Sequence, residues 1–124
     1  MGALGFLTAT EIESDPIQQV SACFVAAGGE KDVYIELLEP DHGSSPISSF
    51  LEKGGGGLHH LCFEVDDIDA VAKTMVKEGF RMVCAPVECV GYDRAFERTC
   101  FQATRIAFFL VSDGLLIELL QQGR

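Results

Sequence analysis

Short apolar segments separated by glycine, aspartate and proline dominate the pattern of this chain. Segments that are rich in β-branched and aromatic residues and bounded by such turn formers are typical of strands. The segments that fit are residues 20–27, 32–39, 58–65, 80–85, 105–112 and 115–122, with a weaker one over 5–13. The pattern therefore predicts a fold with many short strands.

Helical spacing of apolar residues occurs in one longer segment. Between residues 68 and 78 one face collects Ile68, Val71, Ala72, Met75 and Val76. Asp66 or Asp67 can cap the start of this helix, and Gly79 lies where a C-terminal glycine is expected.

A second, shorter helix is predicted ahead of a run of glycines. Ser45 is its expected N-cap, and Pro46 its first helical residue. The glycines at 54–57 follow it, and we expect them to form a flexible joint between two halves of the chain.

The two halves share a faint internal repeat. The motif I-E-L-L occurs in residues 33–40 and again in 115–122, which makes Glu36 and Glu118 equivalent. The second half has the predicted order β-α-β-β-β, and the first half has β-β-β followed by the short helix. We therefore expect one α+β domain over residues 1–124, with an incomplete first module at 1–53 and a complete second module at 58–122.

Composition narrows the class of protein. A chain of 124 residues that is 48% hydrophobic and 23% charged suits a compact domain with a core. Its net charge of −10 disfavours nucleic acid as a partner. No apolar run is long enough for a membrane span, and the N-terminus has no basic flank, so we expect a cytoplasmic protein. Five cysteines without C-x-x-C spacing disfavour a zinc knuckle or a disulfide framework.

Two adjacent histidines head the strand predicted at 58–65, and strand alternation separates them. His60, Cys62 and Glu64 share one face, and His59 shares the other with Leu61, Phe63 and Val65. The second set is apolar, so it should pack against the helix at 68–78. His60 is therefore the histidine expected to face a site.

Glu36 and Glu118 lie among large hydrophobic neighbours on their own strand faces. A carboxylate in such a setting is costly unless it is protonated, paired or bound to a cation. With His60 they form a plausible ligand set for a divalent cation that keeps open positions. The ordinary alternative stays open at this point, because single strand histidines are usually structural and glutamates at strand ends often reach solvent.

The segments "IELLEP", "SPISSFLEKGGGGLHHLCFEVDDIDA" and "LIELLQ" resemble the methylmalonyl-CoA epimerase family of the vicinal-oxygen-chelate superfamily, which includes glyoxalases, bleomycin-resistance proteins and dioxygenases. The resemblance runs from about Leu4 to Gln121 and is strongest over 33–72. It implies paired β-α-β-β-β modules around a metal, with His60, Glu118 and Glu36 as ligands. The implied cofactor is a divalent ion such as Co²⁺, Mn²⁺, Ni²⁺ or Zn²⁺.

The chain departs from the family pattern in three places. The family's first module opens with a strand that carries another histidine ligand and then a helix, and the resemblance implies that this chain lacks both. Before the strand at 20–27, where the epimerases carry a catalytic carboxylate, it has Gln18 and Gln19, with Glu13 or Asp15 as alternatives. Residues 86–104 replace a glycine-rich loop usual in the epimerases.

The resemblance implies a metal-dependent epimerase or isomerase that removes a proton alpha to a carbonyl and stabilises the enolate. Glu118 or Glu36 would carry the proton, and a glyoxalase-type lyase is a related possibility. A different class fits the same fold, namely a drug-binding protein without turnover in which Tyr34, Tyr92 and Phe96 stack on the ligand. The acidic composition favours a cationic ligand in that case. A third alternative is an inactive, truncated remnant.

Assembly follows from the incomplete first module. An unpaired strand edge is usually covered in a native protein. We therefore expect a homodimer in which a second chain closes the first module, and a small molecule as the other partner.

Overall fold

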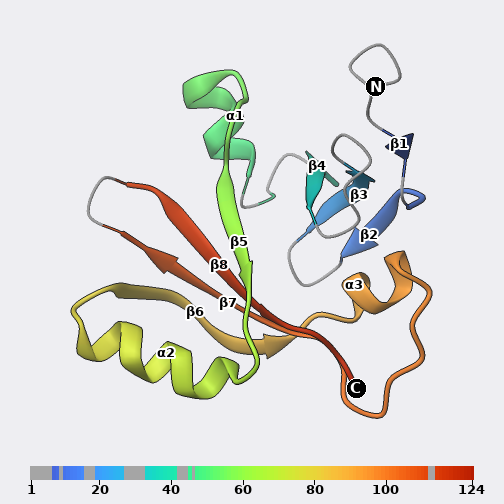
Figure 1. The fold of residues 1–124 in the computed structure, drawn as a ribbon. Coiled ribbons are helices and arrows are strands. Elements are labelled where there is room, and N and C mark those ends of the chain that lie inside the picture. Colours follow the sequence, from blue (N-terminus) through green and yellow to red (C-terminus); the bar gives the residue numbers. More distant parts are fainter. Residues whose placement is uncertain are drawn as a thin grey trace. The chain divides into compact units, whose positions relative to one another are not determined.

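The computed structural model describes residues 7–8, 10–15, 19–26, 33–41, 45, 47–111 and 114–124. The chain divides into two compact units. Unit 1 comprises residues 1–55 and 94–98, and unit 2 comprises residues 56–93 and 99–124 (Figure 1). The division between the units falls within the glycines at 54–57, and residues 94–98 from the second half of the sequence belong to unit 1.

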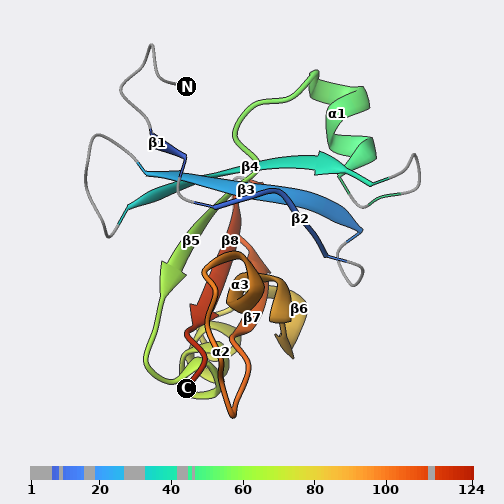
Figure 2. The ribbon, with the colours of Figure 1, turned by 90° about the vertical axis from the view of Figure 1, so that its right-hand side faces the viewer.

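Unit 1 is built on a central strand, β3 (Val20–Ala26). On one edge β3 pairs antiparallel with β4 (Tyr34–Pro40) along its whole length. The other edge of β3 pairs with two short strands, β1 (Leu7–Thr8) near its end and β2 (Glu13–Asp15) near its start (Figure 2). The weak strand predicted over 5–13 is therefore two short strands.

The short helix of unit 1, α1, begins later than predicted and spans Ser48–Gly54. Its N-cap is Ile47, which makes no side-chain cap, so the prediction that Ser45 caps this helix is wrong. The backbone explains the delay, because Ser48 N–H bonds to the carbonyl of Ser45 and forms a turn before the helix starts. Pro46 lies outside the described residues. At the other end Gly55 takes a left-handed conformation (φ 69°) and donates to Leu51, as expected of a C-terminal glycine.

Unit 2 contains a four-stranded sheet in the order β5-β8-β7-β6. The strands are β5 (His60–Glu64), β6 (Arg81–Glu88), β7 (Arg105–Leu110) and β8 (Leu116–Gln121). β5 runs parallel to β8, whereas the other pairs are antiparallel. With helix α2 between β5 and β6, the four strands and α2 follow the predicted β-α-β-β-β order, except that a short helix over residues 90–95 stands between β6 and β7. The α+β class is confirmed.

Helix α2 (Ile68–Lys77) packs on this sheet and forms the core of unit 2 (Figure 1). Asp67 caps it by accepting a hydrogen bond from the Ala70 N–H at 3.1 Å, so Asp67 is the cap among the two aspartates considered. The core side chains are Ile68, Ala72, Ala107, Phe109 and Leu119.

Val76, predicted on the buried face of α2, is 49% exposed. At about 100° per residue it lies roughly 80° around the helix from Ile68, at the margin of the apolar stripe.

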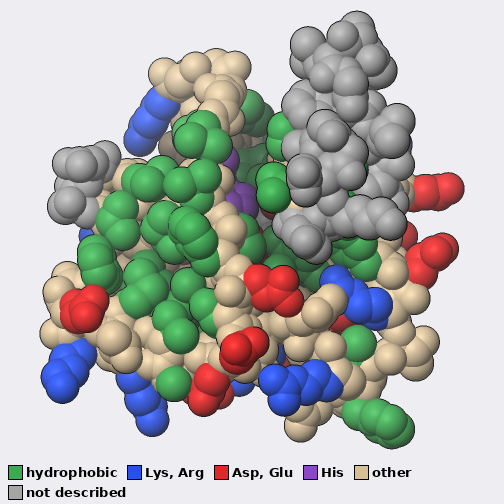
Figure 3. All heavy atoms as spheres, viewed as in Figure 1, with side chains coloured by type: hydrophobic (Ala, Val, Ile, Leu, Met, Phe, Trp, Pro, Cys, Tyr) green, Lys and Arg blue, Asp and Glu red, His purple; other side chains and the backbone are tan. Residues whose placement is uncertain are grey.

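One face of the β5 edge is uncovered, contrary to expectation. Leu61 and Phe63 were predicted to pack under α2, but they are 41% and 53% exposed. The reason is topological: β5 is the edge strand, and α2 packs on β6, β7 and β8. Figure 3 shows hydrophobic side chains gathered on the surface of unit 2 beside β5.

A third helix, α3 (Val90–Ala95), occupies part of the segment that the sequence analysis left irregular. It connects β6 to the loop before β7. Within the described part of the chain, no helix is long and apolar enough to span a membrane.

Candidate functional site

The two repeated glutamates occupy equivalent places in their own units. In unit 1, Glu36 on β4 lies opposite Phe24 of β3. In unit 2, Glu118 on β8 lies opposite Phe108 of β7. Each glutamate therefore belongs to the last strand of an antiparallel pair and has a phenylalanine as its register partner, which supports the internal repeat read from the I-E-L-L motif.

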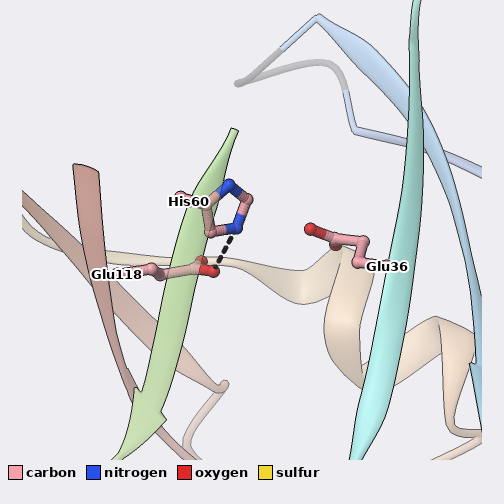
Figure 4. A group of neighbouring side chains, drawn as sticks. All are labelled: Glu36, His60 and Glu118. Carbon is pink, nitrogen blue, oxygen red and sulfur yellow. Dashed lines mark hydrogen bonds and ion pairs between the residues drawn. The ribbon is translucent and has the colours of Figure 1, made fainter. Parts of the chain in front are cut away.

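His60 and Glu118 meet within unit 2. Parallel pairing of β5 with β8 sets Cys62 beside Glu118, so His60 lies on the same face one pleat away. The His60 Nε2 atom is 3.1 Å from Glu118 Oε1, and only 1% of Glu118 is exposed (Figure 4). The contact agrees with His60 as the histidine that faces a site, and its role as a ligand stays a prediction.

His59 contacts His60, which is not where alternation placed it. The Nδ1 atoms of the two rings are 2.9 Å apart, and the rings meet edge to face. His59 precedes the first residue of β5, so strand alternation does not govern its direction. Burial, and then the neighbouring His60, lower the pKa of His59, which favours its neutral form.

This contact has a consequence for the tautomer of His60. Only one of two Nδ1 atoms in contact can carry the shared hydrogen. If His60 Nδ1 donates to neutral His59, the Nε2 atom of neutral His60 carries a lone pair that a cation could use; in the other tautomer Nε2 donates a hydrogen bond to Glu118 Oε1. Ligating histidines commonly donate their second ring N–H, as His60 Nδ1 does in the first tautomer.

Tyr92 is a further partner of Glu118 that the sequence analysis missed in this role. Its hydroxyl donates toward both carboxylate oxygens, at 3.0 Å from Oε1 and 3.2 Å from Oε2. Tyr92 lies on α3, in a segment without periodicity, so nothing in the pattern connected it to a residue 26 positions away.

The buried carboxylate of Glu118 also affects the pKa of Cys84. Burial first, and the charge of Glu118 second, raise the pKa of the Cys84 thiol. This thiol is therefore kept protonated near neutral pH, and it is not an activated nucleophile.

The spacing of His60 and Glu118 fits the binding of one cation. Ligand atoms held at about 2.1 Å from a divalent ion and separated by 90–109° lie about 3.0–3.4 Å apart. The 3.1 Å between His60 Nε2 and Glu118 Oε1 is within this range. Imidazole and carboxylate together suit Zn²⁺, Mn²⁺, Co²⁺ and Ni²⁺.

Glu36, the third predicted ligand, belongs to unit 1. It lies on β4 (Figure 4), between residues 34 and 38 of the same strand face. The structure therefore brings two predicted site residues together within one unit, and the participation of Glu36 stays a prediction.

The aromatic residues of the drug-binding alternative divide between two environments. In unit 1 the rings of Tyr34 and Phe96 contact each other, with centroids 5.2 Å apart, and both contact Phe24. Tyr92 instead bonds to Glu118 through its hydroxyl in unit 2. The two residues considered as alternative bases, Glu13 and Asp15, are the first and last residues of β2.

The fold and the contact between His60 and buried Glu118 define a class: an α+β protein with a glyoxalase-like module that carries this histidine–glutamate contact on its sheet. Residues 1–108 match the model of the glyoxalase/bleomycin resistance protein/dioxygenase superfamily. The chain belongs to this superfamily.

Methylmalonyl-CoA epimerases of several organisms are similar to this chain in sequence. The mitochondrial methylmalonyl-CoA epimerase of Dictyostelium discoideum is 43% identical over 75 residues, which cover 56% of this chain and 43% of that protein. The uncharacterised protein YqjC of Bacillus subtilis is 31% identical over 118 residues, covering 94% of this chain and 73% of its own length.

A solved structure agrees with these relatives. A methylmalonyl-CoA epimerase variant from Streptomyces coelicolor, in complex with 2-nitronate-propionyl-CoA, superposes with a TM-score of 0.76 at 26% identity, covering 99% of this chain and 84% of that one. The match to the Dictyostelium enzyme, by contrast, spans less than half of that enzyme's length.

Proposed function

We propose that this protein is an epimerase or isomerase that acts on a small acyl thioester, by removing and returning a proton at the carbon alpha to a carbonyl. The observation that carries the proposal is the contact between His60 and Glu118, two potential ligands 3.1 Å apart on adjacent strands. Similarity to methylmalonyl-CoA epimerases supports the reaction type and the CoA ester as substrate class.

In this proposal His60, Glu118 and Glu36 hold one divalent ion. The ion, when bound, supplies Lewis-acid stabilisation of the negative charge that develops on the substrate oxygens. His60 contributes Nε2, and its other nitrogen, beside His59, fixes the ring. Glu36 is included because it repeats the sequence context and the strand register of Glu118.

A carboxylate of this set is also the candidate proton carrier. Glu118 or Glu36 would accept the alpha proton. Inversion at this carbon then needs a second proton donor on the opposite face of the enolate, because one carboxylate reaches only one face. The acidic chain, with net charge −10, repels an anionic CoA ester, so the ion's positive charge also offsets this repulsion.

The experiment is hydrogen exchange at the alpha carbon. Methylmalonyl-CoA is incubated in D₂O with protein loaded with Co²⁺, and deuterium incorporation is followed by NMR. The Glu118→Gln variant should lose exchange by roughly 10²–10⁴-fold, since it loses a charged ligand and a candidate base. The matched control is Glu78→Gln, the same change at an exposed residue after α2, which should exchange like the wild type.

A ligand-binding function is the second candidate, and the acidic composition favours it for a cationic ligand. Metal analysis separates the two. Protein that binds no divalent ion and catalyses no exchange, but that binds a cationic aromatic compound, would exclude the epimerase and support sequestration.

A second copy of the chain is the proposed macromolecular partner. Among the described strands β4 pairs with β3 alone, so its outer edge is open, and Tyr34, Ile35 and Leu37 on β4 are exposed. In unit 2 the corresponding strand β8 is paired on both edges. A homodimer that covers β4 would remove this difference.

A further inference from the structure

Tyr92 contacts Glu118, but it belongs neither to the repeated I-E-L-L motif nor to the predicted set of metal ligands. Its hydroxyl lies 3.0 Å and 3.2 Å from the two oxygens of a carboxylate that is almost fully buried. We propose that Tyr92 is a positioning residue, which holds the Glu118 carboxylate in the orientation needed to bind a divalent cation together with His60. The inference rests on the function proposed above.

The physical need for such a residue comes from the freedom of the glutamate side chain. The terminal torsion of glutamate has a broad preference, so the carboxylate plane is not fixed by the side chain itself. A hydroxyl hydrogen placed between both oxygens restricts that rotation. Glu118 Oε1 is then directed to the side where His60 Nε2 lies.

Tyr92 can act in this way only if α3 is itself held in place, and its neighbour Asp93 provides the anchor. Buried Asp93 accepts hydrogen bonds from the Thr104 N–H at 2.8 Å and the Thr104 hydroxyl at 2.7 Å. The Cys89 N–H donates to the Thr104 carbonyl at 2.7 Å. These three hydrogen bonds tie α3 and the residue before it to Thr104, which precedes β7. Strand β7 in turn pairs with β8, the strand of Glu118.

The chain of contacts also fixes the end of β8. The Thr104 hydroxyl accepts a hydrogen bond from the Gly123 N–H at 2.9 Å, two residues beyond β8. A Cβ atom at Gly123 would lie 2.8 Å from the sulfur of Cys100 and 2.9 Å from the Thr104 nitrogen, so the backbones approach closely here. Tyr92 is therefore placed over Glu118 by a buried network and not by a free loop.

Groups that hydrogen-bond to a metal ligand typically change metal affinity 10–100-fold when they are removed. The test is therefore isothermal titration of the full chain with Co²⁺, comparing the wild type with Tyr92→Phe. The variant keeps the ring and removes the hydroxyl alone. We expect its Kd for Co²⁺ to rise about 10–100-fold. We also expect its cobalt absorption bands to shift, because the carboxylate is oriented differently around the ion.

The matched control is Thr74→Val, which removes a side-chain hydroxyl from helix α2. The Thr74 hydroxyl is exposed and donates to the Ala70 carbonyl of the same helix at 3.1 Å. The Co²⁺ affinity of this variant should equal that of the wild type. A urea melt of the metal-free proteins accompanies the titration, so that a general loss of folding is recognised.

The outcomes separate the two ideas. Wild-type protein that binds Co²⁺ while Tyr92→Phe binds it equally well, with unchanged absorption bands, would overturn the role of Tyr92 and leave the metal site intact. Wild-type protein that binds no Co²⁺ would overturn both. A weaker Kd with shifted bands in a folded Tyr92→Phe variant would support the positioning role.

Discussion

At the scale of single residues, the direction of His60 could be predicted because this residue lies in a regular strand, β5. Alternation within residues 58–65 separated His60, Cys62 and Glu64 from Leu61 and Phe63. The pairing of Cys62 with Glu118, which the structure adds, places the face of His60 beside that glutamate. The same rule failed for His59, because this residue precedes the strand. The contact of Tyr92 with Glu118 could not be predicted from the sequence, because it depends on the path of α3 and not on a local periodicity.

Asp93 provides a prediction at this scale. Replacing it with alanine leaves the Thr104 N–H and hydroxyl without their acceptor in a buried place. An orphaned buried donor costs about 1–3 kcal/mol, so we expect the free energy of unfolding to fall by roughly 2–4 kcal/mol. Urea denaturation measures this change. Asp66→Ala, at an exposed position, should change it by less than about 0.5 kcal/mol, and equal effects of the two substitutions would contradict the anchoring role of Asp93.

At the scale of elements, the sequence predicted those that have a clear period and a clear end. The strands of unit 2 and helix α2 were found because their apolar residues alternate or recur at helical spacing. The start of α1 was misplaced because Ser45 has the residue type of a cap but forms a backbone turn instead. Helix α3 was missed because it is short and has a single buried residue, Asp93, which is polar.

A bidentate ion pair connects α2 to β7 and makes a prediction about pH. Arg105 donates to Asp69 at 2.7 Å and 3.0 Å, and these hydrogen bonds lower the pKa of Asp69. A lowered folded-state pKa stabilises the protein above the unfolded-state value, about 3.9, and the stabilisation disappears as pH falls through the folded-state pKa. The difference in unfolding free energy between wild type and Asp69→Asn should therefore be constant near neutral pH and shrink below about pH 4.

The effect should be small and sensitive to salt, because Asp69 is exposed to solvent. Urea melts at several pH values, each with and without added salt, measure it. Asp66→Asn provides the control of the same residue type. A difference for Asp69→Asn that grows on acidification would contradict the sign argued here.

At the scale of the whole molecule, the glycines at 54–57 and the repeated I-E-L-L motif were enough to predict two related halves. The boundary between the units falls in those glycines, and both glutamates are paired with a phenylalanine in register. Residues 94–98 could not be assigned to unit 1 from the sequence, because they follow α3 residues that belong to unit 2. Long-range placement of this kind has no local signature.

The open edge of β4 leads to a prediction about assembly. Ile35 is an exposed apolar residue on this edge strand. If a second copy covers β4, Ile35→Lys should place a charge in the interface and weaken the dimer at least about tenfold, or about 1.4 kcal/mol. Sedimentation velocity over a range of concentrations measures this. Wild-type protein that sediments as a monomer at all concentrations would exclude the dimer.

The hydrogen bond from Tyr92 to Glu118 also provides an internal optical reporter. The chain has no tryptophan and two tyrosines, so phenol groups dominate its ultraviolet emission. An excited phenol is a stronger acid than its ground state, and one that donates to a carboxylate transfers its hydrogen readily and emits weakly. If Tyr34 is replaced by phenylalanine, Tyr92 is the one remaining tyrosine. The fluorescence intensity of Tyr92 would then report whether its hydroxyl is bonded to the Glu118 carboxylate, without any attached dye.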